Sequence, residues 1–180
     1  MAAIEAIKTI YVEADVSSVT FGSIPGTYDS LQLRASGKDG ATGNYSAWYC
    51  QFNSDSGSNY THHFYYGFNS TANGTSDTPC TQARMYGMAS SDRSPQVDEA
   101  AYGVLTCDLH DYADTAKKTT WRYVAGAPVE LGGTIAWFGA AGGGLWNNTS
   151  AVTSWTLGSQ TGGALIRRGT TLTLYGLRNS

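Results

Sequence analysis

Few residues of this chain have the types and spacing that catalysis requires. Glycoside hydrolysis uses two facing carboxylates with different pKa values, but the chain has only four glutamates: Glu5, Glu13, Glu99 and Glu130. Asp98 and Glu99 are adjacent, so a strand would send them to opposite faces, and we interpret them as solvating the start of a strand. No Gly-x-Ser-x-Gly elbow and no phosphate-binding Gly-Lys-Ser/Thr loop occurs. We therefore expect no catalytic residues and no enzyme, although sequence leaves open a carboxylate pair assembled from distant positions.

The histidines and one polar loop are the candidate metal ligands. His62 and His63 are neighbours, so a strand would place one on each face, and Cys107 and His110 would also diverge. The loop from Asn53 to Asn59 has oxygen side chains at alternate positions, like the front of a calcium loop, but position 64 is Phe where a bidentate Glu would stand. We expect a turn held by Asx hydrogen bonds, no metal site and no cofactor.

Three cysteines, Cys50, Cys80 and Cys107, are spread widely along the chain. An odd number at wide spacing is not a disulfide framework. One pair plus one free thiol stays open, but three free thiols and assembly in a reducing cytoplasm are the simpler interpretation.

The aromatic residues are the strongest candidates for binding. Two consecutive predicted strands carry Trp and Tyr on both faces, so alternation would expose some of them, and exposed aromatic rings stack on sugars or anchor protein interfaces. We select Tyr65, Tyr66 and Trp146 as candidate binding residues, with Trp146 and Trp155 expected to be exposed because they lie beside Gly-rich and polar stretches. The alternative is that these rings fill a core that is poor in Leu and Ile.

Alternation with a period of two predicts about ten strands and little or no helix. The ranges are 7–12, 16–21, 28–36, 45–53, 60–68, 101–110, 119–124, 134–138, 151–157 and 171–177. Between them, Gly37–Gly40, Asn53–Gly57, Asn73–Gly74 and Ala141–Gly144 are expected to be turns. Asp111–Lys118 could hold one helical turn. This pattern predicts an all-β protein, an antiparallel β-sandwich of jelly-roll type.

Composition excludes several classes of protein. Charged residues make up 14% of the chain, against about 25% in ordinary domains, and the net charge of −3 argues against nucleic-acid binding. The most apolar stretch, residues 135–146, is too short and Gly-rich to span a membrane, and the first residues do not resemble a secretory signal. We divide the chain into a candidate N-terminal arm, residues 1–15, and a single β-sandwich domain, residues 16–180.

Several segments carry a resemblance to a known group. In order, they are Tyr28–Ser36, Gln51–Tyr60, Asp108–Ala113, Gly144–Trp146, Ala151–Leu157 and Leu172–Leu177. This order resembles small structural proteins of tailed bacteriophages, over about residues 20–177. The resemblance implies a jelly-roll virion component, made in the host cytoplasm, and implies no catalytic residues.

Two functions follow as expectations from this resemblance. The first is a capsid decoration (cement) protein that stabilises the phage head through contacts with the major capsid protein, as a homotrimer whose apolar N-terminal segment adds a strand to a neighbour. The alternative is a tail-fibre or baseplate module that binds host glycans on exposed aromatic rings. Neither function involves nucleic acid or a membrane as partner.

Overall fold

The computed structural model describes residues 3–43, 46–68, 70–90, 101–131 and 134–178, and these ranges hold twelve β-strands and no helix. The strands are β1 (Ala3–Tyr11), β2 (Ser18–Phe21), β3 (Ser30–Asp39), β4 (Ser46–Phe52), β5 (Tyr60–Phe68), β6 (Thr71–Cys80), β7 (Ala83–Ser90), β8 (Gly103–His110), β9 (Thr120–Leu131), β10 (Thr134–Trp146), β11 (Trp155–Ser159) and β12 (Thr171–Arg178). The predicted all-β class is confirmed. Among the described residues, no helix has the length and apolar character that a membrane crossing needs.

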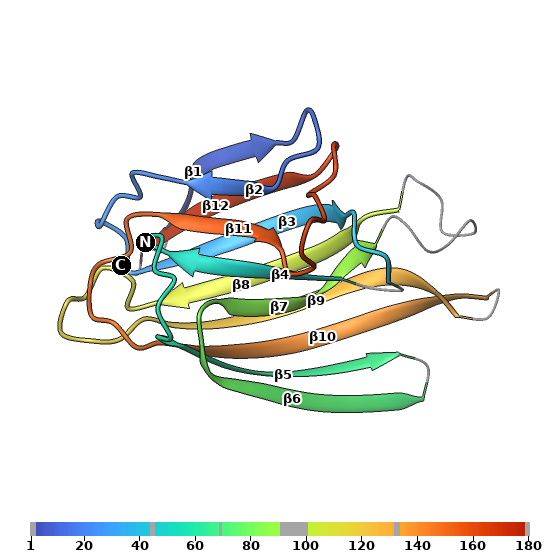
Figure 1. Cartoon of the computed structure of the whole chain (residues 1–180). Helices are drawn as coiled ribbons and strands as arrows, with labels where there is room; N and C mark the ends of the chain where they lie inside the picture. Colours follow the sequence, from blue (N-terminus) through green and yellow to red (C-terminus); the bar gives the residue numbers. More distant parts are fainter. Residues whose placement is uncertain (1–2, 44–45, 69, 91–100, 132–133, 179–180) are drawn as a thin grey trace.

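The strands form two layers of unequal size (Figure 1). The larger layer has the order β1-β12-β3-β8-β9-β10-β5-β6, and its neighbours are all antiparallel. The smaller layer has the order β2-β11-β4-β7. The layers join where the end of β3 runs parallel to the end of β7, at Lys38–Ala89 and Asp39–Ser90. This is a β-sandwich, and its jelly-roll form stays a prediction.

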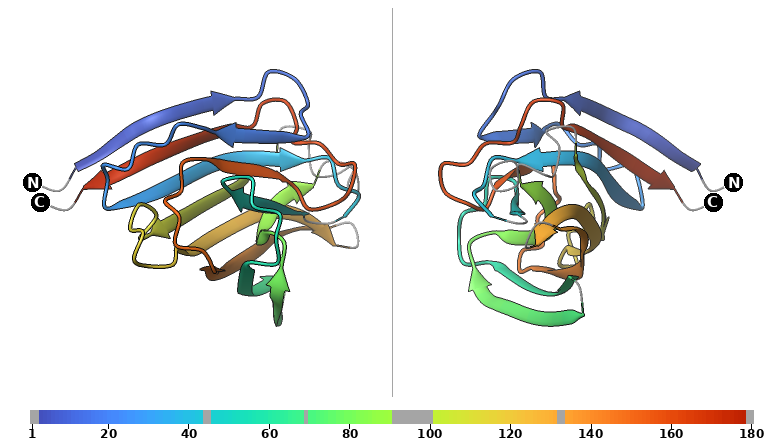
Figure 2. Two further views of the ribbon diagram at one scale, coloured as in Figure 1. Left: turned by 60° about the vertical axis from the view of Figure 1, so that its left-hand side comes forward. Right: turned by 90° about the vertical axis from the view of Figure 1, so that its right-hand side faces the viewer.

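The segment expected to be an arm is a strand of its own sheet. β1 pairs antiparallel with β12, from Ala3 opposite Arg178 to Tyr11 opposite Thr171, with an irregularity between Ala6 and Lys8. Figure 2 shows β1 and β12 running together to one side, where both termini lie. Among the described strands β1 pairs with β12 alone, so the far edge of β1 is an edge of the sheet.

The core between the layers follows the predicted alternation. Leu105, Cys107 and Leu109 of β8 point inward, as do Leu31 and Leu33 of β3. The largest buried group is aromatic: Phe52, Tyr60, Trp121, Trp146 and Trp155. Their rings meet with centroids 5.6–6.4 Å apart, in tilted, edge and stacked arrangements. A core built from aromatic rings explains how a chain poor in Leu and Ile buries enough surface to fold.

Two strands, β6 and β7, were not predicted, and three of the expected turns lie wholly or partly inside strands. β6 has no apolar alternation because it is an exposed edge strand, and Asn73–Gly74, expected to be a turn, lies inside it. Gly142–Gly144 lie inside β10, not in a turn: a Cβ on Gly144 would come within 2.0 Å of the Thr61 carbonyl oxygen and 2.5 Å of the Trp121 ring. Here glycine is needed for close packing rather than for a turn.

The remaining predictions for loops have mixed outcomes. Gly37–Asp39, expected to begin a turn, ends β3. Residues 111–118 form turns without a helix. Asp98 and Glu99 lie outside the described residues.

Candidate binding surface

Large apolar side chains gather on the outer face of the larger sheet. Five large side chains on four adjacent strands point outward and are more than half exposed: Val104 of β8 (51%), Val124 of β9 (66%), Ile135 and Trp137 of β10 (60% and 57%) and Tyr65 of β5 (63%). Large apolar side chains gathered on one face of a soluble domain mark an interaction surface. We call this the β9–β10 face.

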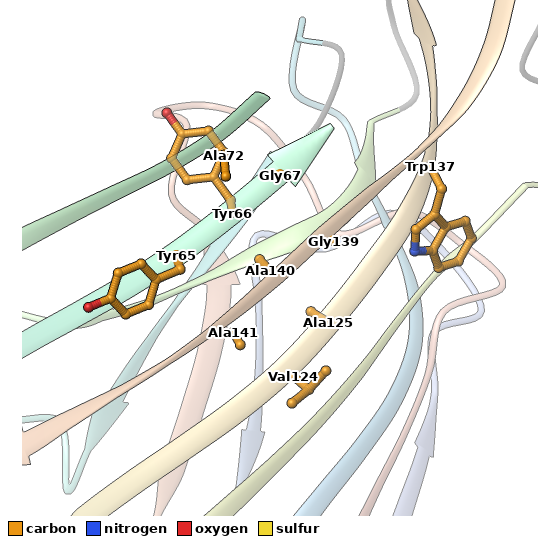
Figure 3. Close-up of a pocket in the computed structure, with 10 residues that line it drawn as sticks. All are labelled: Tyr65, Tyr66, Gly67, Ala72, Val124, Ala125, Trp137, Gly139, Ala140 and Ala141. Carbon is orange, nitrogen blue, oxygen red and sulfur yellow. The ribbon is translucent and has the colours of Figure 1, made fainter. Parts of the chain in front are cut away.

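The β9–β10 face has a ridge with a hollow on each side. The larger hollow, about 450 Å³, extends to Tyr65 and is floored by Ala140 and Ala141. The smaller, about 250 Å³, extends to Val104. Val124 and Trp137 line both hollows, so they form the ridge. Figure 3 shows Tyr65 and Trp137 on either side of a floor of small side chains.

Glycines let the two aromatic rings lie along the sheet. A Cβ on Gly126 of β9 would come within 2.7 Å of the Trp137 ring, and one on Gly74 of β6 within 3.0 Å of the Tyr65 ring. Each ring therefore covers the bare backbone of a neighbouring strand, an arrangement that also stabilises glycine within a sheet. The rings are held by the sheet below them while their outer faces stay accessible.

Charged and amide side chains border this face on the β3 and β8 side. Gln32 Nε2 donates to Asp108 Oδ1 over 2.7 Å, and Arg34 Nε donates to Gln32 Oε1 over 2.7 Å. Arg122 Nε donates to Asp108 Oδ2 over 3.0 Å. Arg34 also lies over the Tyr175 ring at 4.8 Å. An apolar centre with a polar border is the usual anatomy of a protein–protein interface.

Two of the three residues selected from the sequence, Tyr65 and Tyr66, line the larger hollow, and Trp146 does not. Tyr65 points outward and is exposed, as expected. Tyr66, the next residue on β5, faces the other side, where its half-buried ring stacks on Tyr86 and Phe138. Trp146 is buried (1% exposed), so its expected exposure is wrong. It ends β10 and packs between Phe52 and Tyr60, where no ligand can reach its ring.

Trp155 was also expected to be exposed and is buried in the same aromatic group. The exposed tryptophan is Trp137, which sequence reasoning did not select. Its strand is apolar on both faces around residues 135–138, so alternation could not say which face was inside. Apolar residues on both faces of this strand were the signal that one apolar face would be exposed, because a sheet of this sandwich can bury only one of its faces.

The loop from Asn53 to Asn59 is a turn held by its own side chains, as predicted. Asp55 Oδ1 accepts from the Gly57 backbone N–H over 2.8 Å, and Asn59 Nδ2 donates to Asp55 Oδ2 over 2.9 Å. Trp146 Nε1 also donates to Asp55 Oδ2, over 2.7 Å. Burial alone would raise the pKa of Asp55, but these hydrogen bonds outweigh it and lower that pKa below its usual value.

Asp55 is therefore expected to give pH-dependent stability. A carboxylate whose folded pKa is depressed stabilises the fold above its unfolded pKa, near 3.8, and loses that contribution as the pH falls through the folded value. Asp55→Asn should lower the free energy of unfolding at pH 7 by about 2 kcal/mol, the usual contribution of hydrogen bonds to a charged group. Urea titrations at pH 7, 5 and 3 measure this. The gap between wild type and variant should shrink toward pH 3, and a constant gap would contradict the assignment.

The histidines and cysteines lie as the alternation predicted. His62 is buried and His63 exposed, and Cys107 points inward while His110 points outward. All three thiols are free, and burial raises the pKa of Cys50 to about 12. Among the described residues there is no group of three or more His, Cys, Asp or Glu side chains arranged to hold a metal ion.

Comparison with known proteins gives no assignment. No family model, no curated protein and no solved structure matches this chain. The β9–β10 face and the sandwich that supports it are therefore the basis for a functional proposal.

Proposed function

We propose that this chain is a structural protein of a bacteriophage virion, a capsid decoration (cement) protein that binds the major capsid protein through its β9–β10 face. The observation that carries this proposal is the exposed group of Tyr65, Val124 and Trp137 beside a hollow of about 450 Å³. Burying such rings and branched side chains against a partner is the main source of affinity at protein interfaces. The sequence resemblance to phage structural proteins supplies the partner.

The shape and charge of the surface favour a protein partner. A ridge between two hollows can interlock with side chains of a second protein. The polar network of Gln32, Asp108 and Arg122 beside it would form the rim of the contact. The low proportion of charged residues in the chain suits a particle that is exposed to changing salt concentration, because surface ion pairs contribute little when salt screens them.

In this proposal the protein is a homotrimer whose subunits contact one another at β1. The outer edge of β1 offers backbone N–H and C=O groups to a neighbouring strand, and Ile4 and Tyr11 are exposed along it. Adding a strand at such an edge is a common way in which subunits join. When each copy contacts the next in the same way, the rotation between neighbouring copies decides whether the contacts close into a ring. A trimer is one such closed ring.

A glycan-binding module for host attachment is the second candidate. Two exposed aromatic rings, Tyr65 and Trp137, favour it, because sugar rings stack on such side chains. However, among the described residues the hollow between them is lined by no acidic, basic or amide side chain. Sugar hydroxyls need such partners for orientation and specificity, so the surface suits a protein better than a carbohydrate.

Purified particles with and without this protein test the proposal. Particles that carry it should survive heating and low-salt dilution that open particles lacking it, and adding the purified protein back should restore that resistance. Equal survival of both kinds of particle would exclude a cement role. Binding to a glycan array that is lost in Trp137→Ala, together with equal particle survival, would establish the second candidate instead.

A further inference from the structure

A thiol, an imidazole and a carboxylate meet on the inner side of the β5–β6 edge, away from the β9–β10 face. Cys80 Sγ lies 3.4 Å from His62 Nδ1, and His62 Nε2 lies 3.3 Å from Asp77 Oδ2. Arg84 of β7 reaches the same carboxylate oxygen, with its Nη1 3.0 Å from Asp77 Oδ2. This is the arrangement of an activated nucleophile: a base contacts the nucleophile, and a carboxylate orients the base.

The contacts favour the tautomer that a general base needs. A carboxylate beside Nε2 favours the proton on that nitrogen, which leaves the Nδ1 lone pair facing the Cys80 sulfur. The thiol hydrogen has three acceptors within reach: His62 Nδ1 at 3.4 Å, the Tyr60 carbonyl oxygen at 3.2 Å and the Asp77 carbonyl oxygen at 3.8 Å. The thiol can therefore point its hydrogen at the base without any movement of the backbone.

One buried donor in this cluster, Arg84 Nε, has no hydrogen-bond acceptor among the described residues, and the acceptor nearest to His62 Nε2 is the Asp77 carboxylate at 3.3 Å. The His62 side chain is only 1% exposed. Unsatisfied buried donors in a native structure need an explanation, and a bound group is one of them.

At neutral pH, the His62 ring and the Cys80 thiol are both uncharged before any reaction. The ionisable groups that face His62 are Cys80 and Asp77 on β6 and Arg84 on β7. Burial lowers the pKa of His62, so its ring is an unprotonated base at neutral pH, and burial raises the pKa of Cys80. A thiol of high pKa is scarcely ionised by itself but is a strong nucleophile once deprotonated. Removal of its proton by His62 is therefore the step that controls its reactivity.

We propose that Cys80, His62 and Asp77 form a nucleophilic thiol site that accepts an acyl group from a thioester. The Cys80 sulfur bonds to the carbonyl carbon while the bond from that carbon to the leaving sulfur breaks. The Cys80 proton passes to His62 Nδ1 and then to the leaving sulfur, which departs as a thiol. The products are one acylated Cys80 and one free thiol, with no change of oxidation state.

The other two cysteines provide an internal contrast. Cys50 and Cys107 are completely buried in the core, whereas Cys80 is partly exposed at the end of β6. Native protein should therefore react at Cys80 alone, and Cys80→Ser should abolish the reaction. Intact-mass spectrometry counts the groups added, and peptide mapping locates them.

The pH dependence of alkylation tests the role of His62. When a thiol must ionise by itself, its rate of reaction with iodoacetamide rises about tenfold for each unit of increasing pH, as long as the pH is below the thiol pKa. A thiol deprotonated by His62 should react at nearly constant rate from pH 6.5 to 8.0, because His62 is already unprotonated. His62→Asn should lower the rate at pH 6.5 about 100-fold, the lower range for a positioned base, and should restore the tenfold slope. His63→Asn, the neighbour on the outer face, should match wild type.

Asp77→Asn provides the second variant, because the Asp77 side chain is 42% exposed and its replacement does not disturb the core. It should slow alkylation at pH 6.5 and steepen the pH profile even if His62→Asn fails to fold. The acyl probe is the acetyl thioester of N-acetylcysteamine, which should add one acetyl group to wild type at Cys80. A tenfold slope in wild type, an unchanged profile in Asp77→Asn, or no acetyl adduct would overturn the proposal.

Discussion

Replacing Phe52 with alanine is expected to lower the free energy of unfolding by about 4 kcal/mol, the middle of the range for truncating a buried aromatic side chain. Phe52 is fully buried at the end of β4. Its ring contacts Tyr60, Trp121, Trp146 and Trp155, at centroid distances of 5.6–6.1 Å. No neighbouring side chain can move into the space without breaking these contacts, so the cavity would stay largely open.

Chemical denaturation followed by circular dichroism measures this change. Phe52→Leu keeps most of the volume and should cost less than about 1.5 kcal/mol. Gln51→Ala is the control on the same strand, because Gln51 points outward and makes one exposed hydrogen bond to the Thr81 carbonyl. Since small domains have only about 5–15 kcal/mol of stability, Phe52→Ala should also melt well below wild type. A loss no larger than that of Gln51→Ala would contradict the aromatic core described above.

Val124→Asp is expected to abolish attachment to the particle while leaving the fold intact. Val124 is 66% exposed and lies on the ridge of the β9–β10 face. A carboxylate there would be buried without a partner in the bound state, which costs several kcal/mol of affinity. In the free protein the same carboxylate is in water, so the free energy of unfolding should change by no more than about 1 kcal/mol.

Co-sedimentation of the purified protein with particles that lack it measures attachment. Thr20→Asp is the matched control, because it places the same charge on an exposed strand position of the smaller sheet. Thr20→Asp should sediment with particles as wild type does. If Val124→Asp also sedimented normally, the β9–β10 face would not be the contact with the particle.

The sequence predicted the fold wherever one face of a strand is apolar and the other polar. Leu31 and Leu33 on β3, and Leu105 and Leu109 on β8, were assigned to the core correctly for this reason. β6 was missed because an edge strand exposed on most sides has no apolar period. Gly142–Gly144 were assigned to a turn because their role depends on the close approach of β5 and the Trp121 ring, which only the folded chain shows.

The candidate surface was harder to predict than the fold. Tyr65 has the exposed ring that was expected, and Tyr66 also lines the larger hollow although its ring is half-buried. Trp146 is buried, because a residue's neighbours in sequence do not say which side of a sheet it faces. Trp146 lies beside polar residues and is still buried, since its Nε1 donates a hydrogen bond to the Asp55 carboxylate. The cluster of Cys80, His62 and Asp77 was also not predicted. Its members come from two paired strands, whose register brings His62 opposite Asp77.

Hydroxyl-radical footprinting of the assembled particle tests the account most directly, because it reports which side chains the partner covers. Oxidation of Trp137 and Tyr65 should be strong in the free protein and fall to background in the particle. Tyr49, on the outer side of the smaller sheet, should be oxidised equally in both states. Equal oxidation of Trp137 and Tyr65 in the two states would contradict the claim that this protein works through its β9–β10 face.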